Sequence, residues 1–201
     1  MPNWCSTKIK FTGSESEIER FRKLLDEWMS KSYCQNGFDY ADRYCWLGNI
    51  VGNSGIDNRD NGDFNVFCRG SIADMDWSDG ELIIWEESAW APAIRLWEMV
   101  IEKYNLDVQM LFYADECGCG IHDTNDEDYK DLYTVDCCNN DLLKEGLPEY
   151  DDCKQDTLVP LLQKIVKSTE TSIEKLIELV EDTFEEVWIR KWDIVSAGDY
   201  S

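Results

Sequence analysis

Residues 6–28 read STKIKFTGSESEIERFRKLLDEW, and this stretch decides the fold. From Ser6 to Thr12 apolar and polar side chains alternate, with Ile9 and Phe11 on one face and lysines on the other. Alternation at every second residue predicts a half-buried β-strand. Gly13 is expected to end this strand, because glycine readily adopts the backbone conformations of turns.

A helix is predicted directly after this strand. Ser14 and Glu17 have the spacing of a capping box, in which two side chains bind the free N–H groups of the first turn. The apolar residues that follow recur every three or four positions and form one stripe: Ile18, Phe21, Leu25 and Trp28. We expect the helix to end near Ser30.

Three more strands and a second helix are predicted after a long irregular segment at 31–63. The predicted elements are strands at 64–69, 81–87 and 108–113, a turn at 76–80, and a helix from Pro92 to about Asn105. Strand, helix, strand, strand, helix, strand is the ferredoxin-like βαββαβ order, with two helices on one face of a four-stranded antiparallel sheet. The sequence therefore predicts an α+β fold.

An acidic segment follows the fourth strand. Residues 115–152 hold thirteen Asp and Glu against two lysines, and Leu132 to Cys137 is expected to add a strand at the edge of the sheet. The composition changes near Asp156, and the residues that follow predict two amphipathic helices and a final strand. We therefore predict a ferredoxin-like domain at 1–155, and a helical extension at 156–201 that packs on it.

The composition limits the classes of function. An apolar fraction of 43% is enough for a core, no stretch is long enough to span a bilayer, and the first residues lack signal-peptide character. We expect a cytoplasmic protein that does not contact membranes. The net charge of −23 disfavours binding to nucleic acid and favours a protein partner with a basic surface.

Three sequence motifs resemble those of a known family. They are Met1-Pro2-Asn3-Trp4-Cys5, Ser88-Ala89-Trp90-Ala91-Pro92, and Glu116-Cys117-Gly118-Cys119-Gly120 followed by Thr124-Asn125-Asp126. In this order, over about residues 1–128, they resemble the YubB-like ferredoxin-like proteins, which phages, plasmids and other mobile elements carry. The resemblance implies a topology and a mobile-element setting. It implies no activity, because the family is named for its fold.

The motifs supply the candidate binding residues. Trp4 and Trp90 each lie at a predicted element boundary, where a large aromatic side chain either closes the end of the helix and sheet layers or enters a pocket of a partner. The motifs add Glu116, Asn125 and Asp126 as further candidates for binding.

A weak zinc site is considered at Cys117, Cys119 and His122, because zinc prefers thiolate and imidazole ligands. The spacing differs from that of zinc knuckles, and the flanking glycines favour a strand end or a bulge over a zinc site. His122 is the only histidine in the chain. The acids around the two thiols are expected to raise the thiol pKa values, which disfavours nucleophilic catalysis.

Three functional hypotheses follow. The first is a non-enzymatic, acidic interaction protein of a mobile element that binds a basic host protein. Such a protein could act in counter-defence or as a mimic of nucleic acid. The second is a metal- or thiol-dependent activity at Cys117, Cys119 and His122. The third is RNA binding on the sheet face, for which Lys8, Lys10 and Arg69 are the only cations on the first two predicted strands.

Overall fold

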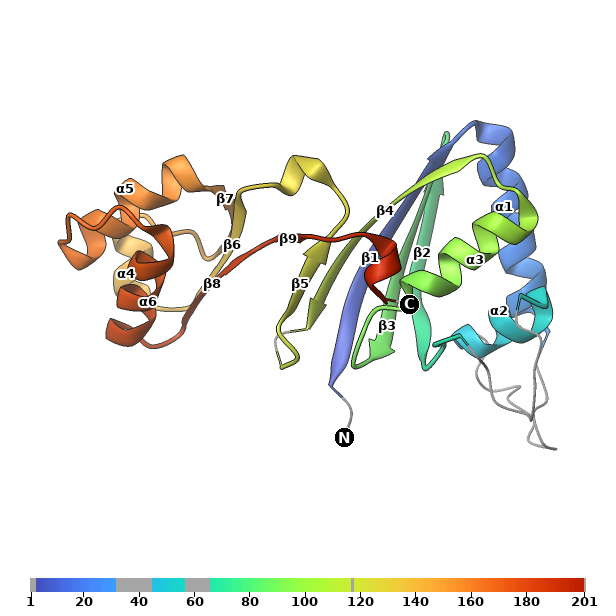
Figure 1. Cartoon of the computed structure of the whole chain (residues 1–201), viewed down its shortest axis with the longest axis horizontal. Coiled ribbons are helices and arrows are strands. Elements are labelled where there is room, and N and C mark those ends of the chain that lie inside the picture. The colour runs from blue at the N-terminus through green and yellow to red at the C-terminus, as the bar shows by residue number, and fades with distance from the viewer. Residues whose placement is uncertain (1–2, 32–44, 57–65, 117, 201) are drawn as a thin grey trace. The chain divides into compact units, whose positions relative to one another are not determined.

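The structure is a computed structural model that describes residues 3–31, 45–56, 66–116 and 118–200 (Figure 1). The α+β class predicted from the sequence is confirmed. The chain forms two compact units, which we call unit 1 (residues 1–126 and 195–201) and unit 2 (residues 127–194). Among the described residues, no helix combines the length and apolar character needed to cross a membrane.

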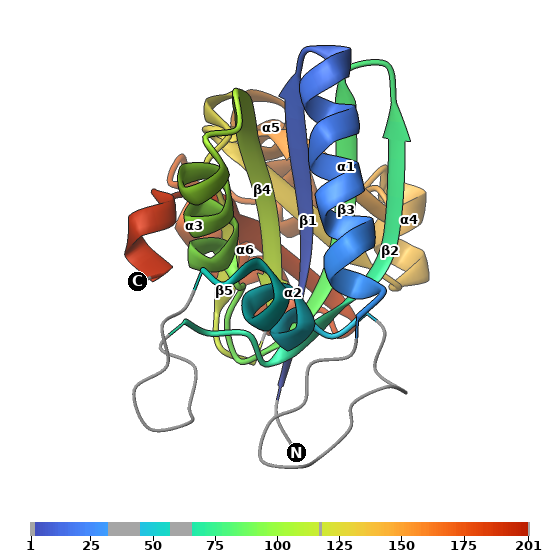
Figure 2. The same ribbon diagram turned by 90° about the vertical axis from the view of Figure 1, so that its right-hand side faces the viewer.

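Unit 1 contains a sheet whose neighbouring strands run in the order β2-β3-β1-β4-β5. All four of these pairs are antiparallel. The strands are β1 (Trp4–Gly13), β2 (Gly70–Ser78), β3 (Glu81–Ala89), β4 (Val108–Glu116) and β5 (Ile121–Thr124). The helices α1 (Glu15–Met29), α2 (Leu47–Ser54) and α3 (Ile94–Tyr104) lie on one face of this sheet (Figure 2).

The core of unit 1 lies between this sheet face and its helices. Ile9 and Phe11 are fully buried there, as the alternation in β1 predicted. The Phe11 ring meets the edge of Phe21 from α1 with a centroid distance of 5.0 Å and Trp97 from α3 at 5.8 Å. Edge-to-face aromatic contacts of this kind add to the stability gained by burying apolar area.

Local signals set the start of α1 and the end of α3 as predicted, whereas α3 begins at Ile94 and not at Pro92. Ser14 is the N-cap of α1, and its hydroxyl accepts the N–H of Glu17 at 3.3 Å. Asn105 ends α3 with φ of 46°. Asparagine tolerates this left-handed conformation better than most residues, which explains why the helix stops there.

The second predicted strand is wrong in position. Residues 64–65 lie outside the described part, residues 66–69 are not in a strand, and β2 instead runs from Gly70 through Ser78. The predicted turn at 76–80 is therefore reduced to Asp79 and Gly80. A register shift between Ile72 and Asp74 breaks the two-residue period that would have revealed the strand.

Little of the 31–63 insertion can be compared with the prediction. Residues 32–44 and 57–63 lie outside the described part of the chain. Between them, the short apolar element expected at Leu47 to Val51 forms α2, with both of these residues fully buried. Gly55 ends α2 with φ of 62°.

Unit 2 has its own sheet and core. The strand β6 (Leu132–Cys137) lies between β7 (Tyr150–Lys154) and β8 (Val187–Lys191), and both pairs are antiparallel. The other elements are the 3₁₀ turn η1 (Glu127–Tyr129), α4 (Asn140–Glu145), α5 (Gln155–Val166), α6 (Ile173–Thr183) and the two-residue strand β9 (Asp193–Ile194). The three helices lie on one side of the three-stranded sheet (Figure 1).

Two predictions about this region need correction. Leu132 to Cys137 is a strand, but it forms the centre of the second sheet and not the edge of the first. The boundary between compact units lies after Asp126 and not at 155/156. The reason is that Tyr133 and Val135 of the acidic segment share one hydrophobic core with the C-terminal helices.

Unit 2 is an insertion in the chain of unit 1. After it, the backbone N–H of Val195 donates to the carbonyl oxygen of Thr124 at 2.9 Å, and the 3₁₀ turn η2 (Ala197–Tyr200) packs against α3. Within unit 2, the Trp192 N–H donates to the carbonyl of Leu132 at 3.1 Å, and its ring meets Tyr129 at 5.3 Å. In each unit, therefore, the two connecting segments lie next to each other.

Candidate functional site

The three motif segments meet around Asn3. Its carbonyl oxygen accepts the backbone N–H of Trp90 at 2.9 Å, and its side-chain Nδ2 lies 3.8 Å from the Sγ of Cys119. We call Asn3, Trp4, Trp90, Glu116 and Cys119 the Asn3 cluster. Segments that are far apart in the sequence thus form one local structure at one end of the first sheet.

Glu116 holds the turn that follows β4. Its Oε1 accepts the N–H of Gly118 at 3.1 Å, and its Oε2 accepts the N–H of Cys119. Desolvation alone would raise the pKa of Glu116, but the hydrogen bonds from Cys119, Gly118 and Asn3 outweigh it and keep this pKa below its ordinary value. A Cβ on Gly118 would lie 2.3 Å from Nδ2 of Asn3, so glycine permits this close approach.

The thiols of Cys5 and Cys119 are not activated. Cys119 is exposed, and its hydrogen bond to the Glu116 carboxylate, together with desolvation, raises the pKa of its thiol. Cys5 is buried, and burial raises the pKa of its thiol to about 12. Because the thiolate is the nucleophilic form, neither group is poised for covalent catalysis at neutral pH. The expected effect of the neighbouring acids is therefore confirmed for Cys119.

Trp4 and Trp90 are both about half exposed, with 53% and 48% of their surface accessible. Trp90 has φ of 76°, in the left-handed region that costs a residue other than glycine about 1–2 kcal/mol. Hydrogen bonds from Trp90 to Asn3 and from Ala89 to the carbonyl of Arg69 hold this conformation. Backbone strain that is fixed by its surroundings is typical of functional positions.

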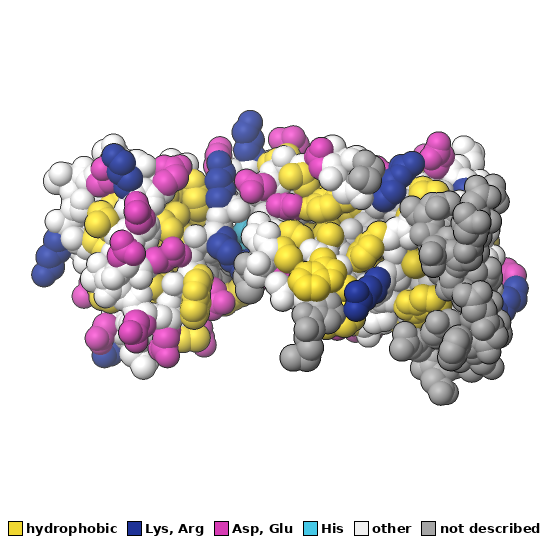
Figure 3. Space-filling view, turned by 60° about the horizontal axis from the view of Figure 1, so that its bottom comes forward, with side chains coloured by type: hydrophobic (Ala, Val, Ile, Leu, Met, Phe, Trp, Pro, Cys, Tyr) yellow, Lys and Arg dark blue, Asp and Glu magenta, His cyan; other side chains and the backbone are white. Residues whose placement is uncertain are grey.

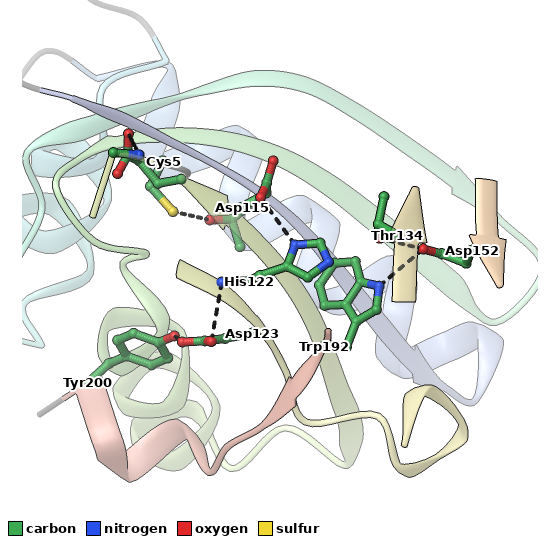
Figure 4. A network of polar contacts seen from close by, with 11 residues as sticks. Cys5, Asp115, His122, Asp123, Thr134, Asp152, Trp192 and Tyr200 are labelled. Atoms are coloured by element: carbon green, nitrogen blue, oxygen red, sulfur yellow. Dashed lines mark hydrogen bonds and ion pairs between the residues drawn. The ribbon is translucent and has the colours of Figure 1, made fainter. Parts of the chain in front are cut away.

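The proposed zinc ligands are only partly described. Cys117 lies outside the described residues, Cys119 contacts Asn3, and Nδ1 of His122 lies 3.2 Å from Oδ1 of Asp115 across the β4–β5 pair (Figure 4). In residues 3–31, 45–56, 66–116 and 118–200, no three His, Cys, Asp or Glu side chains are grouped to hold a metal ion. Zinc binding stays a prediction.

Asn125 and Asp126 contact the neighbouring strand β4. The side-chain amide of Asn125 accepts the N–H of Phe112 at 2.8 Å and donates to the carbonyl of Met110 at 2.9 Å. Oδ2 of Asp126 accepts the Tyr113 hydroxyl at 2.6 Å. These contacts extend the pairing of β4 beyond the end of β5, so both residues have structural roles, and their role in binding stays a prediction.

Sequence reasoning missed Glu86, which lies fully within the core beside the N-terminus of α3. Its carboxylate accepts the N–H of Ala93 at 3.1 Å and Nε1–H of Trp97 at 2.8 Å. Burial raises the pKa of Glu86 even though both donors favour the charged form. The available signal was its position two residues after Ile84 on the apolar side of β3.

A second missed contact involves the C-terminal segment of unit 1. The Tyr200 hydroxyl donates to Oδ2 of Asp123 (Figure 4). The centroid of the Tyr200 ring lies 6.0 Å from that of Phe112. Burial and the Asp123 carboxylate both raise the pKa of Tyr200. This contact secures the segment that follows unit 2 against the first sheet.

Comparisons with known proteins identified no relative of this chain. No protein-family model, curated protein or solved structure matches the chain. The functional argument therefore depends on the geometry and charge of the chain itself.

Proposed function

We propose that this protein is a non-enzymatic binding protein, and that Trp4 and Trp90 of the Asn3 cluster form its main contact surface. The observation that carries this proposal is the pair of half-exposed indoles at the paired ends of β1 and β3. Trp4 is the first residue of β1, and Trp90 directly follows β3 on a strained backbone. Tryptophan is enriched among the residues that dominate interface energies, because it buries a large area at a low cost in side-chain entropy.

The charge around these indoles favours a basic partner. Glu87 and Asp115 both lie opposite Ser6 in the sheet, and Ser6 lies on the same face as Trp4, two residues away. The chain as a whole carries a net charge of −23. Such a surface speeds association with a positively charged protein and disfavours acidic competitors.

The other two hypotheses receive less support from the described contacts. The raised thiol pKa values of Cys5 and Cys119 weigh against thiol chemistry. On the sheet face, Lys8 lies 5.8 Å from the ring centroid of Tyr113, and Lys10 forms a 2.6 Å ion pair with Glu81. Both cations thus have partners in their own sheet, which weighs against an RNA-binding platform.

We further infer that unit 1 has the ferredoxin-like arrangement and belongs with the YubB-like proteins. The inference is supported by the antiparallel order β2-β3-β1-β4, by α1 and α3 on one face, and by the convergence of the quoted motifs at Asn3. A mobile-element protein that binds a basic host protein in the cytoplasm is the corresponding biological role.

The distribution of charge is relevant to nucleic-acid mimicry, which is one form of this role. In Figure 3, the Asp and Glu side chains on the visible face of unit 2 are scattered, with Lys and Arg among them. A mimic of duplex nucleic acid would need a continuous row of carboxylates at the spacing of phosphates. This face therefore favours a contact based on aromatic side chains over mimicry.

A capture experiment with matched variants tests the proposal. Wild-type protein, the double variant Trp4→Ala/Trp90→Ala and the control Trp77→Ala are each immobilised, and the proteins retained from bacterial lysate are quantified. Trp77 is a suitable control because it is 50% exposed in the same unit and its ring lies 4.7 Å from the Arg22 guanidinium.

We expect a partner that the wild type and Trp77→Ala retain equally and that the double variant loses at least about tenfold, as for a central interface residue. Its retention should also fall as salt is raised, because screening weakens the charge attraction. Equal retention of every protein by all three baits would overturn the proposal.

A further inference from the structure

Unit 2 carries a second surface, on the sheet face opposite its helices. In the register of the three strands, Tyr150 of β7 and Trp188 of β8 both lie directly opposite Asp136 of β6. We call these three residues the Asp136 row. The row places one carboxylate between two aromatic side chains.

The pattern along β6 shows which way Asp136 faces. Tyr133, Val135 and Cys137 belong to the core of unit 2, so the alternate residue Asp136 lies on the other face. Trp188 likewise lies between the core residues Val187 and Ile189. Consistent with this, Tyr150 is 70% and Trp188 53% exposed.

The Asp136 carboxylate makes no hydrogen bond or ion pair within the described ranges of the chain. The carboxylate in the adjacent row differs, because Oδ1 of Asp152 accepts the Thr134 hydroxyl at 2.5 Å and Nε1–H of Trp192 at 3.2 Å. Asp152 is thus held by its own unit, whereas both oxygens of Asp136 remain available to a ligand.

The spacing of the strands suits a cation. Adjacent strands lie about 4.8 Å apart, so the outer two residues of the row start about 10 Å from each other. A cation above Asp136 would lie about 5 Å from each of the two flanking strands, a separation at which the Tyr150 and Trp188 side chains can reach it. Cation–π attraction acts over roughly 6 Å from the ring centroid. The carboxylate beneath the cation supplies a charge-assisted hydrogen bond, which an aromatic pair alone lacks.

We propose that the Asp136 row binds a lysine or arginine side chain from an extended basic segment of a partner protein. Unit 2 contains eighteen Asp and Glu against eight Lys and Arg, a net charge of −10, which favours such a segment over an acidic or neutral one. The surface lies in a different unit from the Asn3 cluster and does not depend on the function proposed for that cluster.

The test uses the full chain and two labelled peptides, one of alternating Lys and Ala and one in which Gln replaces every Lys. Binding is measured by fluorescence anisotropy at two salt concentrations. The variants are Asp136→Asn, Trp188→Ala and Trp188→Phe. The control Asp182→Asn removes the same charge from an exposed position on α6 in the same unit.

We expect the lysine peptide to bind and the glutamine peptide not to bind. Asp136→Asn should weaken binding about tenfold, Trp188→Ala about fivefold, and Trp188→Phe less than about threefold, because the phenyl ring keeps a cation–π face. Asp182→Asn should stay within twofold of the wild type. Circular dichroism of each variant checks that unit 2 is folded.

Equal losses in Asp136→Asn and Asp182→Asn would overturn the proposal, because the attraction would then reflect net charge alone. Unchanged binding in Trp188→Ala, or no binding of the lysine peptide to the wild type, would also overturn it. The double variant Trp4→Ala/Trp90→Ala should bind the lysine peptide normally, so this result is separable from the outcome at the Asn3 cluster.

Discussion

Val195 donates its backbone N–H to the carbonyl oxygen of Thr124 at 2.9 Å, although the whole of unit 2 lies between them in the sequence. The two points at which unit 1 is interrupted are therefore hydrogen-bonded neighbours. Insertions are tolerated at such positions, because closing the gap requires only a short loop.

Replacing residues 127–194 with about four Gly and Ser residues should leave unit 1 folded, since a loop of this length spans the gap between hydrogen-bonded strands. Circular dichroism and thermal unfolding would measure this, and a single cooperative transition is expected. The control deletes residues 127–200, which also removes Val195 and Tyr200, and it should be less stable. Loss of cooperative unfolding in the first variant would contradict the prediction.

Trp90→Gly should be more stable than Trp90→Ala by about 1 kcal/mol in the free energy of unfolding. Both substitutions remove the same indole, but only glycine adopts a φ of 76° without strain. Urea denaturation of the two variants measures the difference. Equal stability would show that the backbone at this position relaxes once the indole is removed.

Glu86 should make the stability of unit 1 depend on pH. Burial raises the folded-state pKa of Glu86 above its ordinary value of 4.5, so the folded protein holds this proton more tightly than the unfolded chain does. Its contribution to stability is thus full below pH 4.5 and is lost as pH rises through the folded pKa.

Urea denaturation of the wild type and of Glu86→Gln, from below pH 4.5 upward, tests the direction of this pH dependence. The stability of the wild type relative to Glu86→Gln should be highest at low pH and should fall as pH rises. Glu87→Gln is the control, because Glu87 is exposed on the opposite face of β3. A relative stability that rises with pH would contradict the assignment.

Asn125→Ala should destabilise unit 1 by about 2 kcal/mol, because it leaves the N–H of Phe112 and the carbonyl of Met110 without their partner. Asp126→Asn is the control, since an amide oxygen can still accept the Tyr113 hydroxyl. The measurement is again urea denaturation. No loss of stability in Asn125→Ala would contradict the structural role of this side chain.

The parts of the fold that the sequence predicted well are those set by local patterns. The alternation in β1, the cap at Ser14 and the stop at Asn105 each depend on neighbouring residues only. The position of β2 was missed because a register shift hid its period. The sheet to which β6 belongs was also missed, because the alternation within a strand does not identify its partner strands.

In the candidate site too, the sequence identified individual residues but not the contacts between distant segments. Trp4, Trp90 and Glu116 were each singled out from the sequence, but their meeting around Asn3 was not predicted. The link to Trp90 is a backbone hydrogen bond, which leaves no pattern of side chains along the chain. Glu86 was missed because a charged residue in a strand is usually exposed, and its two donors become neighbours only after folding.

The insertion of unit 2 also sets an order of events during protein synthesis. All of unit 2 leaves the ribosome before the residues from Val195 to Tyr200 that pack on the first sheet. Unit 1 therefore cannot make these contacts until the whole of unit 2 has been synthesised, and translation itself delays the final closure of unit 1.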